Sequence, residues 1–112
     1  MNFRVIPLES FKQNLKKLQK KYRNIKNDVK KLSLELQDNP QSGIALEHNC
    51  YKIRVANSSV PTGKSGGFRT IYYLLDEHKS IFLIAIYSKT QKNNISESEL
   101  VELLKLNGLD LQ

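Results

Sequence analysis

The feature that most limits the fold of this chain is a regular stripe of large apolar side chains in its first third. Successive members are separated alternately by four and three residues, which is the repeat of one helix face. Lysines occupy the other faces, so the pattern predicts amphipathic helix between about residues 10 and 38. The stripe consists of Phe11, Leu15, Leu18, Tyr22, Ile25, Val29, Leu32 and Leu36.

The stripe is compatible with either one long helix or a hairpin of two helices. In the hairpin, the break falls near Arg23 and Asn24, and Asn24 caps the second helix. A long isolated helix would leave the stripe uncovered, so a hairpin or bent helix packed on a sheet is preferred to a coiled-coil arm. Ser10 and Gln13 have the spacing of a capping box and predict where the first helix begins.

Short runs of β-branched and aromatic residues predict a small sheet. Residues 3–6 form an opening strand that Pro7 ends, and residues 50–56, 68–75 and 81–88 form three further antiparallel strands. The last of these runs is apolar on both faces, which indicates a central, covered position.

A final helix completes the predicted fold. Ser96 and Glu99 form a capping box at its start, and Gly108 lies where it should end. The order of strand, helical pair, three antiparallel strands and helix predicts an α+β layer fold, and the length of 112 residues predicts one domain over residues 1–112.

Composition narrows the class of protein. The formal net charge of +7 favours a polyanionic partner. The single cysteine, Cys50, excludes an internal disulfide, and neither a signal peptide nor a membrane span is visible, so a cytoplasmic protein is expected. No metal-ligand spacing is recognised. Gly63-Lys64-Ser65 lacks the earlier glycine of a P-loop, since Ser58 stands there, and a strand follows instead of a helix.

Cationic and aromatic residues are predicted to share one face of the sheet. Alternation places Arg69 with Tyr73, and Tyr87 with Lys89, and Lys52 and Arg54 share a face of the preceding strand. Such a surface binds RNA through phosphate contacts and through bases stacked on tyrosine. The alternative is that the glycines between residues 63 and 67 simply form a hairpin loop.

Four stretches of the chain resemble the HigB branch of the RelE toxin superfamily. They are Tyr51-Lys52-Ile53-Arg54-Val55-Ala56, Gly63-Lys64-Ser65-Gly66-Gly67-Phe68-Arg69-Thr70-Ile71-Tyr72-Tyr73, Ile86-Tyr87-Ser88-Lys89 and Asn94-Ile95-Ser96. The resemblance implies a RelE/ParE-like fold, in which a small antiparallel sheet packs against an N-terminal helical pair and carries a C-terminal helix. It also implies a bacterial type II toxin, a ribosome-dependent mRNA endonuclease that needs no cofactor or metal and is silenced by a cognate antitoxin.

The resemblance also implies the site. The catalytic positions carried over are Arg54, Lys64, Arg69 and Lys89, and the expected RNA-binding residues are Lys52, Tyr73, Tyr87 and Lys92. Arginine offers a forked set of donors to phosphate oxygens, so the two arginines are expected to stabilise charge, and Lys64 or Lys89 to exchange protons. The tyrosines are expected to stack a base or relay a proton. Neither a histidine nor a tyrosine stands in residues 107–112, where some relatives have one.

Two other functions are compatible with the sequence. A toxin of the ParE type binds DNA gyrase and does not need these cations gathered on one face. A non-catalytic RNA-binding or repressor-like module would bind RNA without producing cleaved ends. The partners expected for the preferred function are the antitoxin and mRNA on the ribosome, with no membrane, and with DNA contacted only through the antitoxin.

Overall fold

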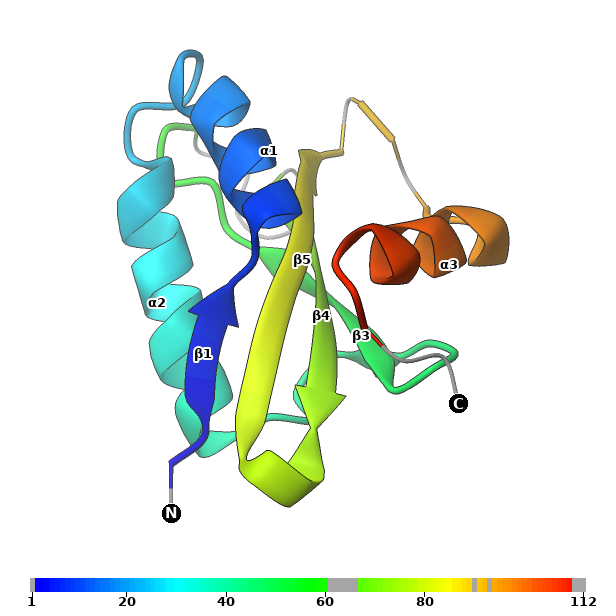
Figure 1. The fold of residues 1–112 in the computed structure, drawn as a ribbon. Coiled ribbons are helices and arrows are strands. Elements are labelled where there is room, and N and C mark those ends of the chain that lie inside the picture. Colours follow the sequence, from blue (N-terminus) through cyan, green and yellow to red (C-terminus); the bar gives the residue numbers. More distant parts are fainter. Residues whose placement is uncertain (1, 61–66, 90, 93, 110–112) are drawn as a thin grey trace.

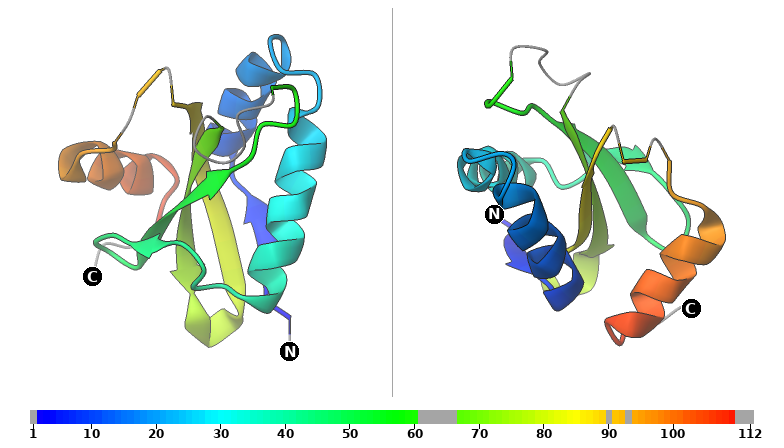
Figure 2. Two further views of the ribbon diagram at one scale, coloured as in Figure 1. Left: turned by 180° about the vertical axis from the view of Figure 1, so that it is seen from behind. Right: turned by 90° about the horizontal axis from the view of Figure 1, so that it is seen from above.

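The computed structural model describes residues 2–60, 67–89, 91–92 and 94–109. A five-stranded sheet forms the centre of the molecule, with a helical pair on one face and a last helix on the other (Figure 1, Figure 2). This arrangement confirms the predicted α+β fold. The elements in chain order are β1 (Arg4–Pro7), α1 (Glu9–Gln19), α2 (Ile25–Asp38), β2 (Ile44–Ala45), β3 (Cys50–Val55), β4 (Phe68–Leu75), the 3-10 helix η2 (Asp76–His78), β5 (Ser80–Ser88) and α3 (Glu97–Leu106). None of the helices in the described residues is long and apolar enough to cross a membrane.

The order of strands in the sheet is β1-β5-β4-β3-β2. The three predicted antiparallel strands are β3, β4 and β5, and β4 has the predicted bounds. Two features were not expected. β1 pairs with β5 in parallel, with Arg4 opposite Ser80, and the two-residue strand β2 pairs Ile44 with Lys52. β5 therefore lies between β1 and β4 and is covered on both faces, which explains its apolar sequence.

The apolar stripe of the first third is buried against the sheet. α1 and α2 are separate helices, which confirms the hairpin and excludes the long helix and the coiled-coil arm. Phe11, Ile25 and Leu36 are each at most 1% exposed. Tyr22, in the turn between the helices, packs edge-on against Phe68 of β4 with ring centroids 5.2 Å apart. Burial of the stripe therefore holds the helical pair on the sheet.

The predicted capping box at Ser10 is wrong. The N-cap of α1 is Leu8, and Ser10 lies inside the first turn. The register between β4 and β5 shifts so that Ile84 has no partner residue on β4, and its carbonyl oxygen accepts a hydrogen bond from the Ser10 hydroxyl. The Ser10 hydroxyl thus ties α1 to β5 and does not cap the helix. Asn24 does occupy the N-cap of α2, but its side chain makes no capping hydrogen bond.

α3 covers part of the second face of the sheet. The capping box at its start is confirmed, because the backbone N–H of Glu99 donates to Ser96 Oγ and the backbone N–H of Ser96 donates to Glu99 Oε1. Gly108, just beyond its end, has a φ of +69°, which favours glycine. Leu100 and Leu104 pack into a second cluster of buried residues that includes Cys50, Ile71, Tyr73, Ile84, Ala85 and Tyr87. We call this set the α3-side core.

Candidate nucleic-acid interface

Two arginines and a tyrosine form a row across the three central strands. Arg54 of β3 lies opposite Arg69 of β4, and Arg69 lies opposite Tyr87 of β5. Because side chains alternate between the faces of a strand, this row shares a face with Ile71 and Tyr73 of the α3-side core. The facing predicted for Arg54, Arg69 and Tyr87 is therefore confirmed.

Gly67 allows the ends of these strands to converge. A Cβ atom at this position would lie 1.9 Å from the carbonyl oxygen of Val55, at the end of β3. The backbone N–H of Lys89, just after β5, donates a hydrogen bond to the carbonyl oxygen of Gly67 at 3.3 Å. Only a residue without a side chain fits here, and its presence brings Lys89 next to the start of β4.

Four cationic side chains, Lys52, Arg54, Arg69 and Lys89, line one groove with a volume of about 650 Å³, which we call the basic groove. Glu35 of α2 is the one carboxylate among its described lining residues. A groove with this excess of positive charge suits a polyanionic ligand. The other lining residues are Ser42, Gly43, Ile44, Ile53 and Asn94.

Arg69 is the buried member of the basic groove. Its side chain is 5% exposed, and Nη1 donates a hydrogen bond to the carbonyl oxygen of Phe68 at 3.3 Å. Burial lowers the pKa of the guanidinium, the neighbouring Arg54 lowers it further, and Tyr87 acts in the opposite sense. Arginine stays protonated in proteins, so a positive charge is kept partly desolvated at the floor of the groove. In such surroundings a charge acts on an anion more strongly than it does in water.

The tyrosines of the predicted RNA surface lie beneath it. Tyr73 and Tyr87 are each 8% exposed and belong to the α3-side core. Burial raises the pKa of Tyr87, while Arg69 lowers it and Glu99 adds to the rise. The Tyr87 hydroxyl is buried and has no hydrogen-bond partner among the described residues. In this conformation neither ring offers its face to a stacking base.

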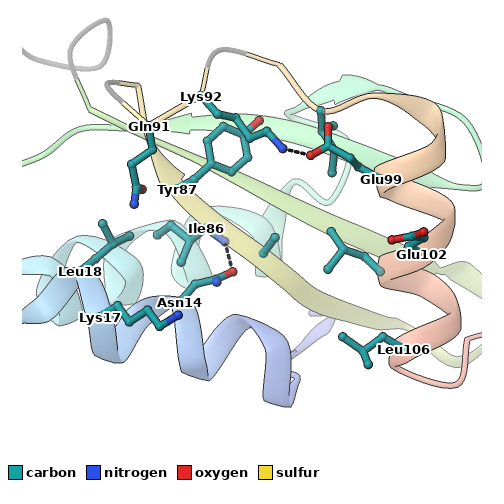
Figure 3. A pocket seen from close by; sticks show the side chains of 13 residues that line it. Asn14, Lys17, Leu18, Ile86, Tyr87, Gln91, Lys92, Glu99, Glu102 and Leu106 are labelled. Carbon is teal, nitrogen blue, oxygen red and sulfur yellow. Dashed lines mark hydrogen bonds and ion pairs between the residues drawn. The ribbon is translucent and has the colours of Figure 1, made fainter.

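Lys92 lies in a different groove, between α1 and α3. Its ammonium pairs with the Glu99 carboxylate, and the ring of Tyr87 extends from β5 towards this ion pair (Figure 3). We call this cavity the α1–α3 groove. Its lining residues are Asn14, Lys17, Leu18, Ala85, Ile86, Tyr87, Gln91, Lys92, Ile95, Glu99, Glu102, Leu103 and Leu106.

Comparison with known proteins decides the family. A sequence model of the RelE toxin of the RelE / RelB toxin–antitoxin system matches residues 9–110. The chain belongs to the RelE toxin family. It is thus a toxin of a toxin–antitoxin system. Its predicted place in the HigB branch of this family stays a prediction.

Solved structures of E. coli RelE have the same fold as this RelE-family chain. A free mutant of RelE, in which two arginines are replaced by alanine, is 21% identical, covers 95% of this chain and 98% of its own, and superposes with a TM-score of 0.62. The toxin of the intact E. coli RelBE toxin–antitoxin complex is 23% identical over 75% of this chain and 93% of its own, with a TM-score of 0.54. The same double mutant bound to a RelBc antitoxin peptide is 22% identical, with a TM-score of 0.54, over 91% of this chain and 93% of its own.

The basic groove of this RelE-family toxin contains three of the four predicted catalytic residues, Arg54, Arg69 and Lys89. The fourth, Lys64, lies outside the described residues. Of the predicted RNA-binding residues, Lys52 lines the groove, and its Nζ donates a hydrogen bond to Asn94 Oδ1 at 3.1 Å. Glu35 and Asn94 were not predicted. Glu35 reaches the groove only because α2 packs beside it, and local sequence patterns do not predict this packing.

The toxin also brings three possible metal ligands together, outside the basic groove. The side-chain ligand atoms of Glu47, His48 and Glu97 lie within 4.8 Å of one another. Both carboxylates are exposed, so water solvates them without a bound ion. The sequence did not predict this group, because Glu97 is brought to the turn before β3 only by the docking of α3.

Proposed function

We propose that this RelE-family toxin is a ribosome-dependent mRNA endonuclease and that the basic groove holds the scissile phosphate. The observation that supports this most directly is the pairing of Arg54 with Arg69 in a groove that Lys52 and Lys89 also line. Phosphate oxygens accept hydrogen bonds from guanidinium groups in a forked geometry, and two such groups side by side suit a centre on which negative charge increases.

The proposed chemistry uses the nucleophile that RNA itself carries. The ribose 2′-hydroxyl attacks the adjacent phosphorus, the bond to the 5′-oxygen of the next nucleotide breaks, and a 2′,3′-cyclic phosphate and a 5′-hydroxyl result. Arg54 and Arg69 stabilise the added charge on the phosphorane, an effect that is worth about a hundredfold in rate or more per donor. Lys64 and Lys89 exchange protons with the 2′-hydroxyl and the leaving 5′-oxygen.

The remaining predicted site residues either bind RNA phosphates or support the basic groove. Lys52 contacts a phosphate next to the cleaved bond, and Lys92, which lines the α1–α3 groove, contacts a phosphate further along the strand. Because Tyr73 and Tyr87 are buried, we assign them to the support of the groove floor in place of base stacking. A small cationic groove has few groups with which to orient RNA, so the ribosome supplies the orientation by presenting a fixed segment of mRNA. We therefore expect the activity in the cytoplasm.

The cognate antitoxin is the second proposed partner. The E. coli RelE toxin has been solved with the antitoxin RelB, both as the intact complex and with a RelBc peptide. For the present chain we propose that an acidic or amphipathic antitoxin segment covers the basic groove. A gyrase-binding toxin of the ParE type has no need of four cations in one groove, which favours the endonuclease.

Primer extension in cells that express the toxin tests this function. Two versions of one message are compared, one with a working start codon and one without. We expect new 5′ ends only in the translated message, and none with Lys89→Ala, whose side chain is exposed and should not be needed for folding. Equal cleavage of both messages would reject the ribosome-dependent mechanism. Growth arrest with intact messages and altered plasmid supercoiling would support the gyrase alternative.

A further inference from the structure

The connection between β5 and α3 contributes to both grooves. Lys89 and Asn94 line the basic groove, whereas Gln91 and Lys92 line the α1–α3 groove. The hydrogen bond from Lys52 to Asn94 ties this connection to β3. The lining of the α1–α3 groove includes two cations, Lys17 and Lys92, and two carboxylates, Glu99 and Glu102, and Lys92 is the cation nearest in sequence to Lys89 of the basic groove.

Lys92 is already paired in the free protein. Its ammonium contacts Glu99 Oε2, while Glu99 Oε1 accepts the capping hydrogen bond from the backbone N–H of Ser96. The hydrogen bond from Lys92, together with those from Ser96, lowers the pKa of Glu99 from 4.5 to about 2, so the carboxylate is ionised at neutral pH. It occupies the position on Lys92 that a phosphate oxygen would otherwise take.

This ion pair is accessible to a competitor. The side chains of Lys92 and Glu99 are 34% and 47% exposed, and exposed ion pairs are weak because water and salt screen them. A phosphate of an RNA strand that is already anchored in the basic groove would arrive at high effective concentration. Displacing Glu99 would then leave its negative charge close to the RNA.

We propose that Glu99 is an internal counterion that competes with RNA phosphate for Lys92 and so weakens RNA binding along the α1–α3 groove. This inference rests on the proposed function, because it needs RNA in the basic groove. Tyr87 supports a polar ligand at this place, since its unpartnered, buried hydroxyl belongs to a side chain that lines the same groove. When the ion pair opens, Lys92 gains a phosphate and Glu99 becomes a repulsive neighbour.

The chain offers a matched pair of substitutions for the test. Glu99→Gln removes the charge and keeps the capping box, because glutamine at this position accepts the same backbone hydrogen bond. Glu102→Gln makes the same change of net charge on the same helix and in the same α1–α3 groove, where Glu102 is exposed and the carboxylate paired with Lys92 is that of Glu99. The probe is a fluorescent single-stranded 2′-O-methyl RNA decamer, which binds without being cleaved, titrated at several salt concentrations.

One further phosphate contact to single-stranded nucleic acid adds about 0.7 to the slope of log affinity against log salt. We therefore expect Glu99→Gln to bind the decamer about three- to fivefold more tightly than Glu102→Gln at 0.1 M salt. The affinity of Glu99→Gln should also fall more steeply with salt concentration than that of Glu102→Gln. In a Lys92→Gln background the two substitutions should have equal effects, because the contested cation is gone.

Two control results separate the inference from the proposed function. If Lys89→Gln weakens binding of the decamer while Glu99→Gln and Glu102→Gln bind alike, the RNA site stands and the counterion role of Glu99 is rejected. If Lys89→Gln binds as the wild type does, or the wild type does not bind at 0.05 M salt, the basic groove is not an RNA site and both proposals fail. A Glu99→Gln gain that persists without Lys92 would also overturn the inference.

Discussion

Arg54 and Arg69 lie directly opposite each other on β3 and β4, with their side chains on the same face of the sheet. Like charges in opposite positions of an antiparallel pair destabilise it. Arg54 also contributes to the lowered pKa of Arg69. The fold thus maintains an unfavourable pair in its central strands, and a phosphate between the two guanidinium groups would turn the repulsion into attraction.

Substitution of Arg54, the exposed member of this pair, should lower the activity without lowering the stability. We expect Arg54→Gln to lower mRNA cleavage about a hundredfold, because one charge stabiliser is lost. Thermal stability should be unchanged or slightly higher, because a like-charge contact is removed. Arg23→Gln, in the exposed turn between α1 and α2, is the matched control and should keep full toxicity. Loss of activity through unfolding, seen as a lower Tm, would contradict this prediction.

The buried arginine requires a different substitution. Arg69→Lys keeps the positive charge but not the forked set of donors. We expect cleavage to fall about a hundredfold with soluble, folded protein, because a single ammonium cannot hold two phosphate oxygens in the guanidinium geometry. Cleavage rates and circular dichroism of the purified variant check this. A lysine variant with wild-type activity would show that charge alone suffices.

Tyr72 fixes the wall of the basic groove. Its buried hydroxyl donates to the carbonyl oxygen of Pro40 at 2.7 Å and accepts from the backbone N–H of Gly43 at 3.2 Å. Tyr72→Phe leaves both groups without this partner, so we expect a loss of about 1–3 kcal/mol in the free energy of unfolding. Denaturant unfolding measures it. Tyr51→Phe, which removes a hydroxyl from the ring stacked on Tyr72, is the comparison and should cost less.

The single cysteine, Cys50, should react very slowly with thiol reagents in the folded protein. Cys50 is fully buried, and burial raises the pKa of its thiol from 9.0 to about 12. The folded state therefore favours the neutral thiol, and stability should fall above about pH 9, where only the unfolded chain ionises. A thiol reagent at pH 8 should label native protein very slowly and unfolded protein at once. Rapid labelling of native protein would contradict the buried position.

Neutralisation by an antitoxin should depend on salt. The apolar stripe of α1 and α2 is buried against the sheet, so it is not a surface on which an antitoxin could lie in this structure. We expect the basic groove to attract an acidic segment, with an association rate that falls as ionic strength rises and is slowed by Lys89→Gln. The product of the adjacent gene, co-purified and then measured by surface plasmon resonance, tests this. Association that is indifferent to salt and to Lys89→Gln would argue against the groove as its target.

The sequence predicted those parts of the fold that rest on local repeats. The spacing of the stripe located both helices, because burial of one helix face imposes a helical period. Strand β4, which is buried on both faces, was predicted with its observed bounds from its run of β-branched and aromatic residues. The box at Ser96 was confirmed since both of its partners are local. The box at Ser10 failed because the helix begins at Glu9, which leaves Ser10 inside its first turn, where the hydroxyl donates to the carbonyl oxygen of Ile84.

The site was only partly predictable for the same reason. Alternation grouped Lys52 with Arg54 on one strand and Arg69 with Tyr73 on the next, but the common face of the two groups depends on the register of β3 against β4, which the structure supplies. The burial of Tyr87 depends on where α3 docks, and the entry of Glu35 depends on how α2 crosses the sheet. Neither position can be predicted from a local sequence pattern. The parallel pairing of β1 with β5 could likewise not be predicted, because the sequence of a short strand does not indicate which strand it pairs with.

The pairing of Arg4 with Ser80 joins positions that are 76 residues apart. A growing chain thus makes β1 and both helices before the strands on which they pack exist, and it holds its apolar stripe uncovered during most of synthesis. Arg54, Arg69 and Lys89 also come together only after β5 has emerged. A product that ends before Lys89 therefore has no complete basic groove, and under the proposed function translation itself delays toxicity until this residue has been added.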